Sequence, residues 1–237
     1  MEGRPKKAIC ECTWAQPGDR IAVYDRKSFL QTAEFTVKSV SPNGIFETED
    51  MSGTVKQGCV LANKAFFAAV HIDGCTLRST RARGALIQTQ NVLIENSYIY
   101  GMSYAGLLFS PDIKRWWEVA PAENVEIRNN IFEHCSHASD TMPDGAVSFK
   151  ASHDGESGEY PAGVHKNISI HNNRFKDFCG CGIFVSAADS VRIEDNVFDR
   201  DKTAQKQGFD IRLVNCRNTK IHNNRDDDFP ERLISIE

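Results

Sequence analysis

Residues 124–132 read NVEIRNNIF, residues 167–175 read NISIHNNRF, and residues 190–198 read SVRIEDNVF. Each copy has two apolar residues two positions apart, then an Asn or Asp pair, then an apolar residue five places after the second apolar one. Weaker copies lie at 70–77 and 92–99, and a broken copy lies at 221–224. Short apolar segments follow the copies at 85–87, 107–109, 147–149, 183–185 and 211–213. This recurrence is typical of a repeat protein.

The spacing of the copies predicts the fold. Their first apolar positions are 70, 92, 125, 168 and 191, so the steps are 22, 33, 43 and 23 residues. A unit of 22 or 23 residues with insertions fits one coil of a right-handed parallel β-helix, in which alternate residues point inward. The Asn pair stands where the chain turns between strands, because Asn tolerates the left-handed region and its amide can bond the next coil. An antiparallel sandwich is the alternative, but it does not require Asn at one fixed place in every unit.

The N-terminal part of the chain lacks the repeat. Residues 17–19 (PGD) and 41–44 (SPNG) are turn sequences between short apolar segments. They predict a small antiparallel β-barrel module at 8–60. The β-helix is predicted at 61–237, with 61–67 as the join, so the whole chain is predicted to be all-β.

Composition excludes several classes of partner. The 237 residues carry a net charge of −4 and no stripe of Lys and Arg, so we expect no nucleic acid partner. No apolar run reaches the length of a membrane span, and no signal peptide is visible in residues 1–7. The pairs Cys10-x-Cys12 and Cys179-x-Cys181 have the wrong spacing for a usual zinc site. No metal and no cofactor are therefore predicted.

The insertions are the segments where function is expected, because binding and catalysis concentrate in long loops on a rigid scaffold. They lie at 110–123, 134–144 and 152–166. The first contains Trp116 and Trp117 beside the acids Asp112 and Glu118. Indole faces suit the apolar face of a sugar ring, and carboxylates suit its hydroxyls. An equally good interpretation is that the two Trp side chains only cover the sheet.

Charged side chains on the first strand of each coil are predicted to point outward in one column. The column contains Asp73, Glu95, Arg128, His171, Glu194 and His222. Its mixed signs indicate weak pairing between coils about 4.8 Å apart, without chemistry. Asp210 and Arg212 are likewise predicted to point outward from the last full coil as a surface pair.

Several of these motifs resemble one enzyme family. The stretch RARGALI at 81–87 is followed by VLIEN at 92–96, and Asp112, Trp116, Trp117 and Glu118 lead into NVEIRNN at 124–130. Together with the PGD turn that opens a small barrel, they resemble the α-1,3-galactosidases of glycoside hydrolase family 110 over about residues 8–215. The resemblance implies β-helix enzymes that remove terminal α-1,3-linked galactose from glycans, with inversion and without a metal.

The chain departs from the family pattern in one respect. In the family, coils and a paired-Asp segment precede the barrel, whereas this sequence begins at the barrel. Its own acidic run, Asp226 to Asp228, lies in the broken last repeat. We therefore expect the C-terminal part of such an enzyme, secreted or periplasmic if it belongs to a full-length family member.

Inverting glycosidases need an acid and a base with carboxyl groups roughly 6.5–9.5 Å apart. The sequence offers Glu118 and Asp144 as candidates for these catalytic roles. Candidates for substrate binding are Arg81, Arg83, Asp112, Trp116 and Trp117. The plain alternatives are that the Arg83 stem packs along the coil and that Glu118 is a solvated loop acid.

Without the upstream acids, we expect this chain by itself to hydrolyse α-1,3-galactosides very poorly. Two other classes stay open: a non-catalytic carbohydrate-binding or structural β-helix, and a polysaccharide lyase. A lyase of this fold would need clustered acids for Ca²⁺, and no tight cluster is evident in the sequence. An open end of the β-helix around residues 68–77 also predicts self-association.

Overall fold

The computed structural model describes residues 14–42, 44–113, 118–138, 145–151, 160–199, 208–230 and 233–237. The chain divides into two compact units, Met1–Phe67 and Ala68–Glu237. Each unit has its own apolar core. No helix in the described part of the chain is long and apolar enough to span a membrane.

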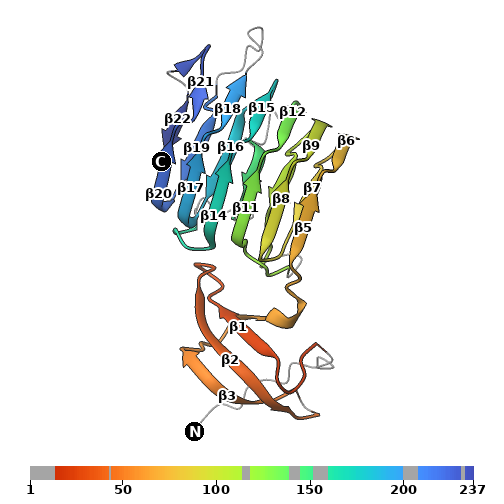
Figure 1. Ribbon diagram of the computed structural model, residues 1–237. Coiled ribbons are helices and arrows are strands. Elements are labelled where there is room, and N and C mark those ends of the chain that lie inside the picture. Colours follow the sequence, from red (N-terminus) through yellow and green to blue (C-terminus); the bar gives the residue numbers. More distant parts are fainter. Residues whose placement is uncertain are drawn as a thin grey trace. The chain divides into compact units, whose positions relative to one another are not determined.

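The first unit is an antiparallel sheet with the strand order β3-β2-β1-β4 (Figure 1). Its elements are β1 (Arg20–Tyr24), β2 (Gln31–Val40), β3 (Phe46–Gly53), β4 (Val60–Asn63) and the 3-10 helix η1 (Lys64–Phe66). Alternate residues such as Ile21, Val23 and Phe35 form its core, against which Trp14 and Phe46 pack. In the described residues β3 and β4 are the two edges of the sheet.

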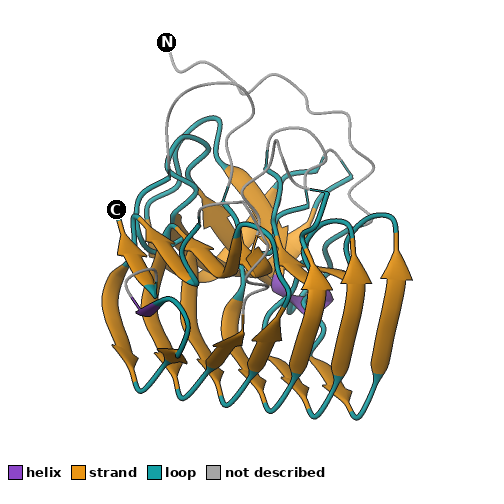
Figure 2. Ribbon diagram, turned by 90° about the horizontal axis from the view of Figure 1, so that it is seen from above, coloured by secondary structure: helices purple, strands orange, loops and turns teal. Residues whose placement is uncertain are grey.

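The second unit is a parallel β-helix of three six-stranded sheets (Figures 1 and 2). Sheet 1 contains β5 (Val70–Asp73), β8 (Val92–Glu95), β11 (Glu123–Arg128), β14 (His165–His171), β17 (Ala188–Glu194) and β20 (Arg217–His222). Sheet 2 contains β6 (Thr76–Thr80), β9 (Tyr98–Met102), β12 (Ile131–Cys135), β15 (Arg174–Lys176), β18 (Val197–Asp199) and β21 (Arg225–Asp226). Sheet 3 contains β7 (Ala85–Ile87), β10 (Leu107–Phe109), β13 (Gly145–Phe149), β16 (Cys181–Ser186), β19 (Ile211–Val214) and β22 (Ile234–Ile236).

The register of these strands confirms the predicted fold class. Val92, Val125, Ile168 and Val191 are in register across sheet 1, and all four are buried. In sheet 2 the ring of Phe175 stacks between Phe132 and Phe198, with centroids 4.9 and 5.0 Å apart. One residue of each repeat therefore lies directly above the same residue of the coil before it.

The two Asn positions of the repeat have different structural roles. The first residue of each pair is left-handed, with φ of 56° at Asn129, 55° at Asn172 and 55° at Asp195. Asn or Asp tolerates this conformation better than most residues, so the chain can turn sharply from sheet 1 to sheet 2.

The second residue of each pair builds a buried ladder. The Nδ2 of Asn130 donates to Asn173 Oδ1, Asn173 donates to Asn196, and Asn196 donates to Asn224, at 3.0, 3.0 and 2.9 Å. Each Oδ1 also accepts a backbone N–H from the coil before it; Asn130 N donates to Asn173 Oδ1 at 3.0 Å, for example. The turn between sheets 1 and 2 is thereby satisfied internally in every coil.

The predicted outward column of sheet 1 is also confirmed, since Glu95, Arg128, His171 and Glu194 are in register. Arg128 donates to Glu95 at 2.8 Å and to Glu126 at 3.0 Å. The contact with Glu95 links neighbouring coils on the solvent face, as expected for a mixed-charge ladder.

The prediction that Asp210 points to solvent is wrong. Asp210 is 0% exposed, and its carbonyl accepts the backbone N–H groups of Gly182 and Ile183, both at 2.9 Å. In register, Asp210 occupies in its coil the position that Gly182 occupies in the coil before. A Cβ atom added to Gly182 would lie 2.6 Å from the Phe198 ring, so side chains at this position point toward the interior. This position faces the corner between sheets 2 and 3. Arg212 does reach the surface, where it forms hydrogen bonds to Glu237 at 2.9 Å.

Removing a ring from the sheet 2 stack tests the core assignment. We expect Phe175→Ala to lower the free energy of unfolding by roughly 3–5 kcal/mol, because it leaves a cavity between two rings. Chemical denaturation measures the loss, and Phe66→Ala is the control because Phe66 is 69% exposed. A loss below about 1 kcal/mol for Phe175→Ala would contradict the assignment.

A second test concerns His165, which begins β14. The imidazole is 0% exposed, and its Nδ1 accepts the backbone N–H of Ala122 at 3.1 Å. Burial lowers the pKa of His165 to about 4, and the backbone of Lys150 offsets this shift only in part. The folded state thus favours the neutral ring.

Because the folded pKa of His165 lies below the unfolded value near 6.5, the folded state binds fewer protons in this window. The contribution of His165 to the free energy of unfolding is fully present above about pH 6.5. We expect about 3 kcal/mol of this free energy to be lost as the pH falls toward 4. Urea unfolding of the wild type and of His165→Gln at several pH values measures it. Equal pH slopes in both proteins would disprove the contribution.

Candidate functional site

The coils differ in length because the connections to sheet 3 differ in length. The turn from sheet 1 to sheet 2 has two residues in every coil, as at 96–97 and 129–130. The long connections all enter or leave sheet 3, and they span residues 110–122, 136–144, 150–164 and 200–210. The outer face of sheet 3 and its two borders are therefore the candidate functional surface.

The outer face of sheet 3 is mostly apolar in the first two coils. Leu86 and Leu108 are in register there; Leu86 is 39% exposed and Leu108 is half-buried. Further along the same column, Ser148 and Phe184 are in register and buried, at 0% and 8% exposure. The accessible part of this face thus lies at Leu86 and Leu108.

Glu118 lies at the border that follows β7 and β10. Gln88, the residue after β7, donates through Nε2 to Glu118 Oε2 at 2.8 Å and to the Ser110 carbonyl at 2.9 Å. The Glu118 carboxylate is consequently fixed at the end of the Leu86–Leu108 face, although the residue as a whole is exposed.

Asp112 faces Glu118 across the base of the insertion. The two residues form an antiparallel bridge, in which Asp112 N donates to Glu118 O at 2.9 Å. Residues opposite each other in such a bridge extend their side chains from the same side, with Cβ atoms roughly 4.5–5.5 Å apart. The side chains of Asp112 and Glu118 therefore leave the backbone next to each other, beside sheet 3.

Arg81 and Arg83 lie at the opposite border, in the turn that precedes β7. Both are exposed, and the Arg83 carbonyl accepts the Thr80 hydroxyl at 3.1 Å. Within the described residues neither guanidinium pairs with a carboxylate. Four residues lie between Arg83 and Gln88, and three of them form β7. The two arginines and the Glu118 carboxylate therefore flank this short strand from its two ends.

The structure thus brings together part of the predicted set. Glu118 and Asp112 meet at one end of β7, and Arg81 and Arg83 lie at the other. The remaining candidates, Trp116, Trp117 and Asp144, fall outside the described residues. Their predicted roles, substrate binding for the two Trp residues and catalysis for Asp144, stay predictions.

Sequence reasoning missed Gln88. A signal for it exists, because the position that follows Ile87 in register is polar in four successive coils of sheet 3: Gln88, Ser110, Lys150 and Ser186. Only its hydrogen bond to Glu118 marks it as part of the candidate site.

One group of potential metal ligands lies elsewhere, on sheet 1. Ligand atoms of His71, Asp73 and Glu95 are within 4.8 Å of one another. Arg128 already donates to Glu95, and Asn96 donates to Asp73. Because a guanidinium beside Glu95 disfavours a cation, we assign no metal to this group.

Comparison with known proteins identifies relatives. The family model for the right-handed β-helix region matches residues 58–228. Alpha-1,3-galactosidase A of Bacteroides thetaiotaomicron is 30% identical over 219 residues, which are 88% of this chain and 37% of that protein. Alpha-1,3-galactosidase B of the same organism is 26% identical over 244 residues, covering 94% of this chain and 38% of that protein.

These matches bear out the resemblance that the sequence motifs indicated. The chain spans well under half the length of the two galactosidases, at 37% and 38%. The family match ends before β22 and includes the other strands of the three parallel sheets. The chain belongs to the right-handed β-helix family and is similar within it to the α-1,3-galactosidases.

Proposed function

We propose that this carbohydrate-active β-helix protein binds terminal α-1,3-linked galactose of glycans on the outer face of sheet 3. The observation that supports it is the Asp112–Glu118 bridge, which holds two carboxylates at the end of the Leu86–Leu108 face. An apolar floor with convergent polar groups suits a sugar ring, whose hydroxyls need acceptors and whose C–H face needs apolar contact. The names of the relatives point to the same class of ligand.

Each side chain has a separate role in this proposal. Glu118, oriented by Gln88, accepts hydrogen bonds from sugar hydroxyls, and Asp112 does so beside it. Arg81 and Arg83 donate to oxygens of the sugar from the opposite end of β7. Trp116 and Trp117 belong to the same insertion as the two acids, and we propose that they stack on the ring.

The reaction proposed for the complete site is removal of the terminal galactose with inversion. Such a reaction needs a proton donor at the leaving oxygen and a base for water on the opposite face of the sugar. Asp112 and Glu118 extend from the same side of one bridge, so together they supply one of these two positions. Asp144 is our candidate for the other position if turnover shows that this chain carries a complete acid–base pair, and no metal is required.

A binding and turnover experiment tests the proposal. We expect the chain to bind an α-1,3-linked digalactoside, and Glu118→Gln to bind it roughly tenfold more weakly because a charge-assisted hydrogen bond is lost. Glu126→Gln, on the outer face of sheet 1, is the matched control. Titration calorimetry measures affinity, and released galactose measures turnover, which we expect to stay below about 1 s⁻¹.

The outcomes separate the alternative functions. Equal affinities of the wild type and Glu118→Gln would move the glycan site away from sheet 3. Turnover of about 1 s⁻¹ or faster would show that a complete acid–base pair lies within the chain. If the protein degrades an acidic polysaccharide and EDTA abolishes this activity, the protein is a lyase. Binding of the digalactoside without turnover favours a non-catalytic carbohydrate-binding protein.

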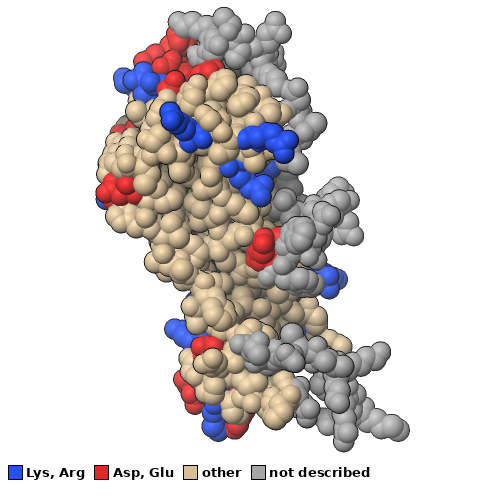
Figure 3. Space-filling view, turned by 90° about the vertical axis from the view of Figure 1, so that its right-hand side faces the viewer, with Lys and Arg blue, Asp and Glu red and all other residues tan. Residues whose placement is uncertain are grey.

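We also propose that the first coil mediates self-association. Its inward residues Val70, Ile72 and Leu77 are only partly buried, whereas Val92 and Ile99 of the next coil are 2% and 0% exposed. Strands β5, β6 and β7 are edges of their sheets in the described residues. Figure 3, seen from the side of these strands, shows that most of the described surface there carries no charged residue. Apolar contact and unpaired edges favour pairing with a second copy.

Charge on this edge should oppose the contact. We expect the wild type to show a concentration-dependent rise in mass by sedimentation equilibrium. Leu77→Lys should stay monomeric, because Lys on an edge strand opposes pairing. Arg225→Lys, on the last strand of sheet 2, is the control. A wild-type chain that stays monomeric up to the highest concentration reached by sedimentation would rule out self-association.

A further inference from the structure

Four aromatic rings follow one another on the outer face of sheet 2. Tyr98 and Tyr100 belong to β9, His134 belongs to β12, and His137 lies in the turn after it. Their successive ring centroids are 5.9, 6.2 and 4.4 Å apart, and the first and last of these pairs are stacked. We call these four residues the ring strip.

The ring strip lies on the solvent side of its sheet. On the inner side of the same strands, Ile99, Met102 and Phe132 are 0–1% exposed. By contrast, Tyr100 is 37% exposed, and the His134 side chain is 43% exposed. The fold therefore does not need these rings to fill its core.

In the coils that follow β9, the same face of sheet 2 carries charged residues in register with one another. Lys176 is in register with Glu133, and Asp199 is in register with Lys176. Arg174 pairs with Asp199 at 3.1 Å. In the described part of this face, the stacked rings lie on β9, at His134 of β12 and in the turn after it, whereas the ion pairs run from Glu133 of β12 to Asp199 of β18.

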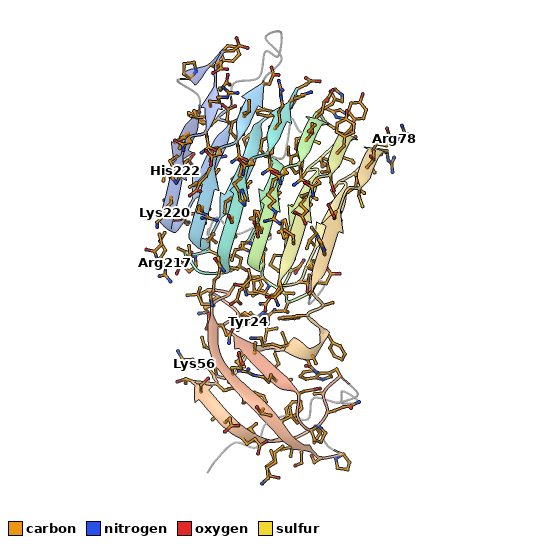
Figure 4. All side chains as sticks on the ribbon, viewed as in Figure 1. Tyr24, Lys56, Arg78, Arg217, Lys220 and His222 are labelled. Atoms are coloured by element: carbon orange, nitrogen blue, oxygen red, sulfur yellow. The ribbon has the colours of Figure 1, made fainter. Side chains whose placement is uncertain are left out.

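Carboxylates border the ring strip. The Tyr98 hydroxyl donates to Glu133 Oε2 at 3.2 Å, and His134 Nδ1 lies 2.6 Å from Asp177 Oδ2. Burial and the neighbouring Glu133 raise the pKa of Tyr98, so its hydroxyl stays protonated and can donate. Arg78 is in register with Tyr100 on the neighbouring strand, and Figure 4 shows it at the outer edge of the sheet.

We propose that the ring strip is a second carbohydrate-contact surface, which binds a galactose-containing oligosaccharide. One face of galactose presents C–H groups that pack on aromatic rings. Its hydroxyls can bond Glu133 and Asp177 at the border of the strip. Several rings in succession suit several sugar residues, so we expect longer glycans to bind better than a disaccharide.

The charges favour a glycan over a nucleic acid. Single-stranded nucleic acid also stacks on aromatic side chains, but its binding depends on a positively charged groove that follows the phosphates. Glu133 and Asp177 border the rings together with Arg78 and Lys176. The border is therefore of mixed sign and not a positively charged groove, and the chain carries a net charge of −4. A neutral polyhydroxylated ligand fits this surface better.

The ring strip is separate from the site proposed on sheet 3, because it lies on different strands and a different face. The two proposals share the class of ligand and no residue. Variants can therefore disable either surface while the other is left intact.

The experiment compares Tyr100→Ala, Tyr100→Phe and Glu118→Ala with the wild type. Saturation-transfer NMR and titration calorimetry use an α-1,3-linked galactose disaccharide and a tetrasaccharide. We expect Tyr100→Ala to weaken tetrasaccharide binding roughly five- to tenfold, which is about 1.0–1.4 kcal/mol, because the stacking of the ring on a sugar is lost. Tyr100→Phe keeps the ring and should bind as the wild type does, and Phe66→Ala is a control for an exposed ring elsewhere.

The outcomes distinguish this proposal from the previous one. Loss of tetrasaccharide affinity in Tyr100→Ala but not in Tyr100→Phe supports the ring strip, whatever Glu118→Ala does. Unchanged affinity in a folded Tyr100→Ala variant, with loss in Glu118→Ala, overturns the ring strip and leaves sheet 3 standing. Binding of a single-stranded oligonucleotide in preference to the sugars also overturns the proposal.

Discussion

The buried Asn ladder is the constraint on which the β-helix depends. Asn130, Asn173, Asn196 and Asn224 each accept a backbone N–H from the preceding coil and donate to a carbonyl of that coil. One side chain thereby satisfies the turn and fixes the rise between coils. Because these amides are buried, a shift of one residue in any coil would leave several polar groups without partners. The ladder therefore holds the register that the apolar columns fill.

The same constraint explains how much of the fold the sequence predicts. A buried amide has to recur at one place in each coil, and the apolar residues before and after it recur with it. The strands and their register could thus be predicted from positions such as Val125, Asn130 and Phe132. Asp210 could not, because it takes the place of Gly182 at a corner where no periodic pattern indicates which way a side chain points.

The candidate site was predictable only in part, for a related reason. Nothing repeats in the insertions, so spacing cannot show which side chains meet. The motif that contains Asp112 and Glu118 pointed to this loop as a candidate, but only coordinates show that the two acids face each other and that Gln88 bonds one of them. Sequence reasoning placed Arg83 and Glu118 in one candidate site, and only the structure shows that they lie at opposite ends of β7.

Departures from the repeat are consequently the most informative residues in this molecule. At the last coil Asp226 takes the place of the stacked ring, in register with Phe198, and its carboxylate accepts the N–H groups of Asp228 and Phe229. That departure ends the aromatic column, since a carboxylate that closes a turn cannot stack. Tyr100 and His134 depart in the opposite sense, because they place rings on a solvent face where the next coils carry ion pairs. A column that repeats serves stability, whereas a column that changes where the fold does not require it points to a ligand.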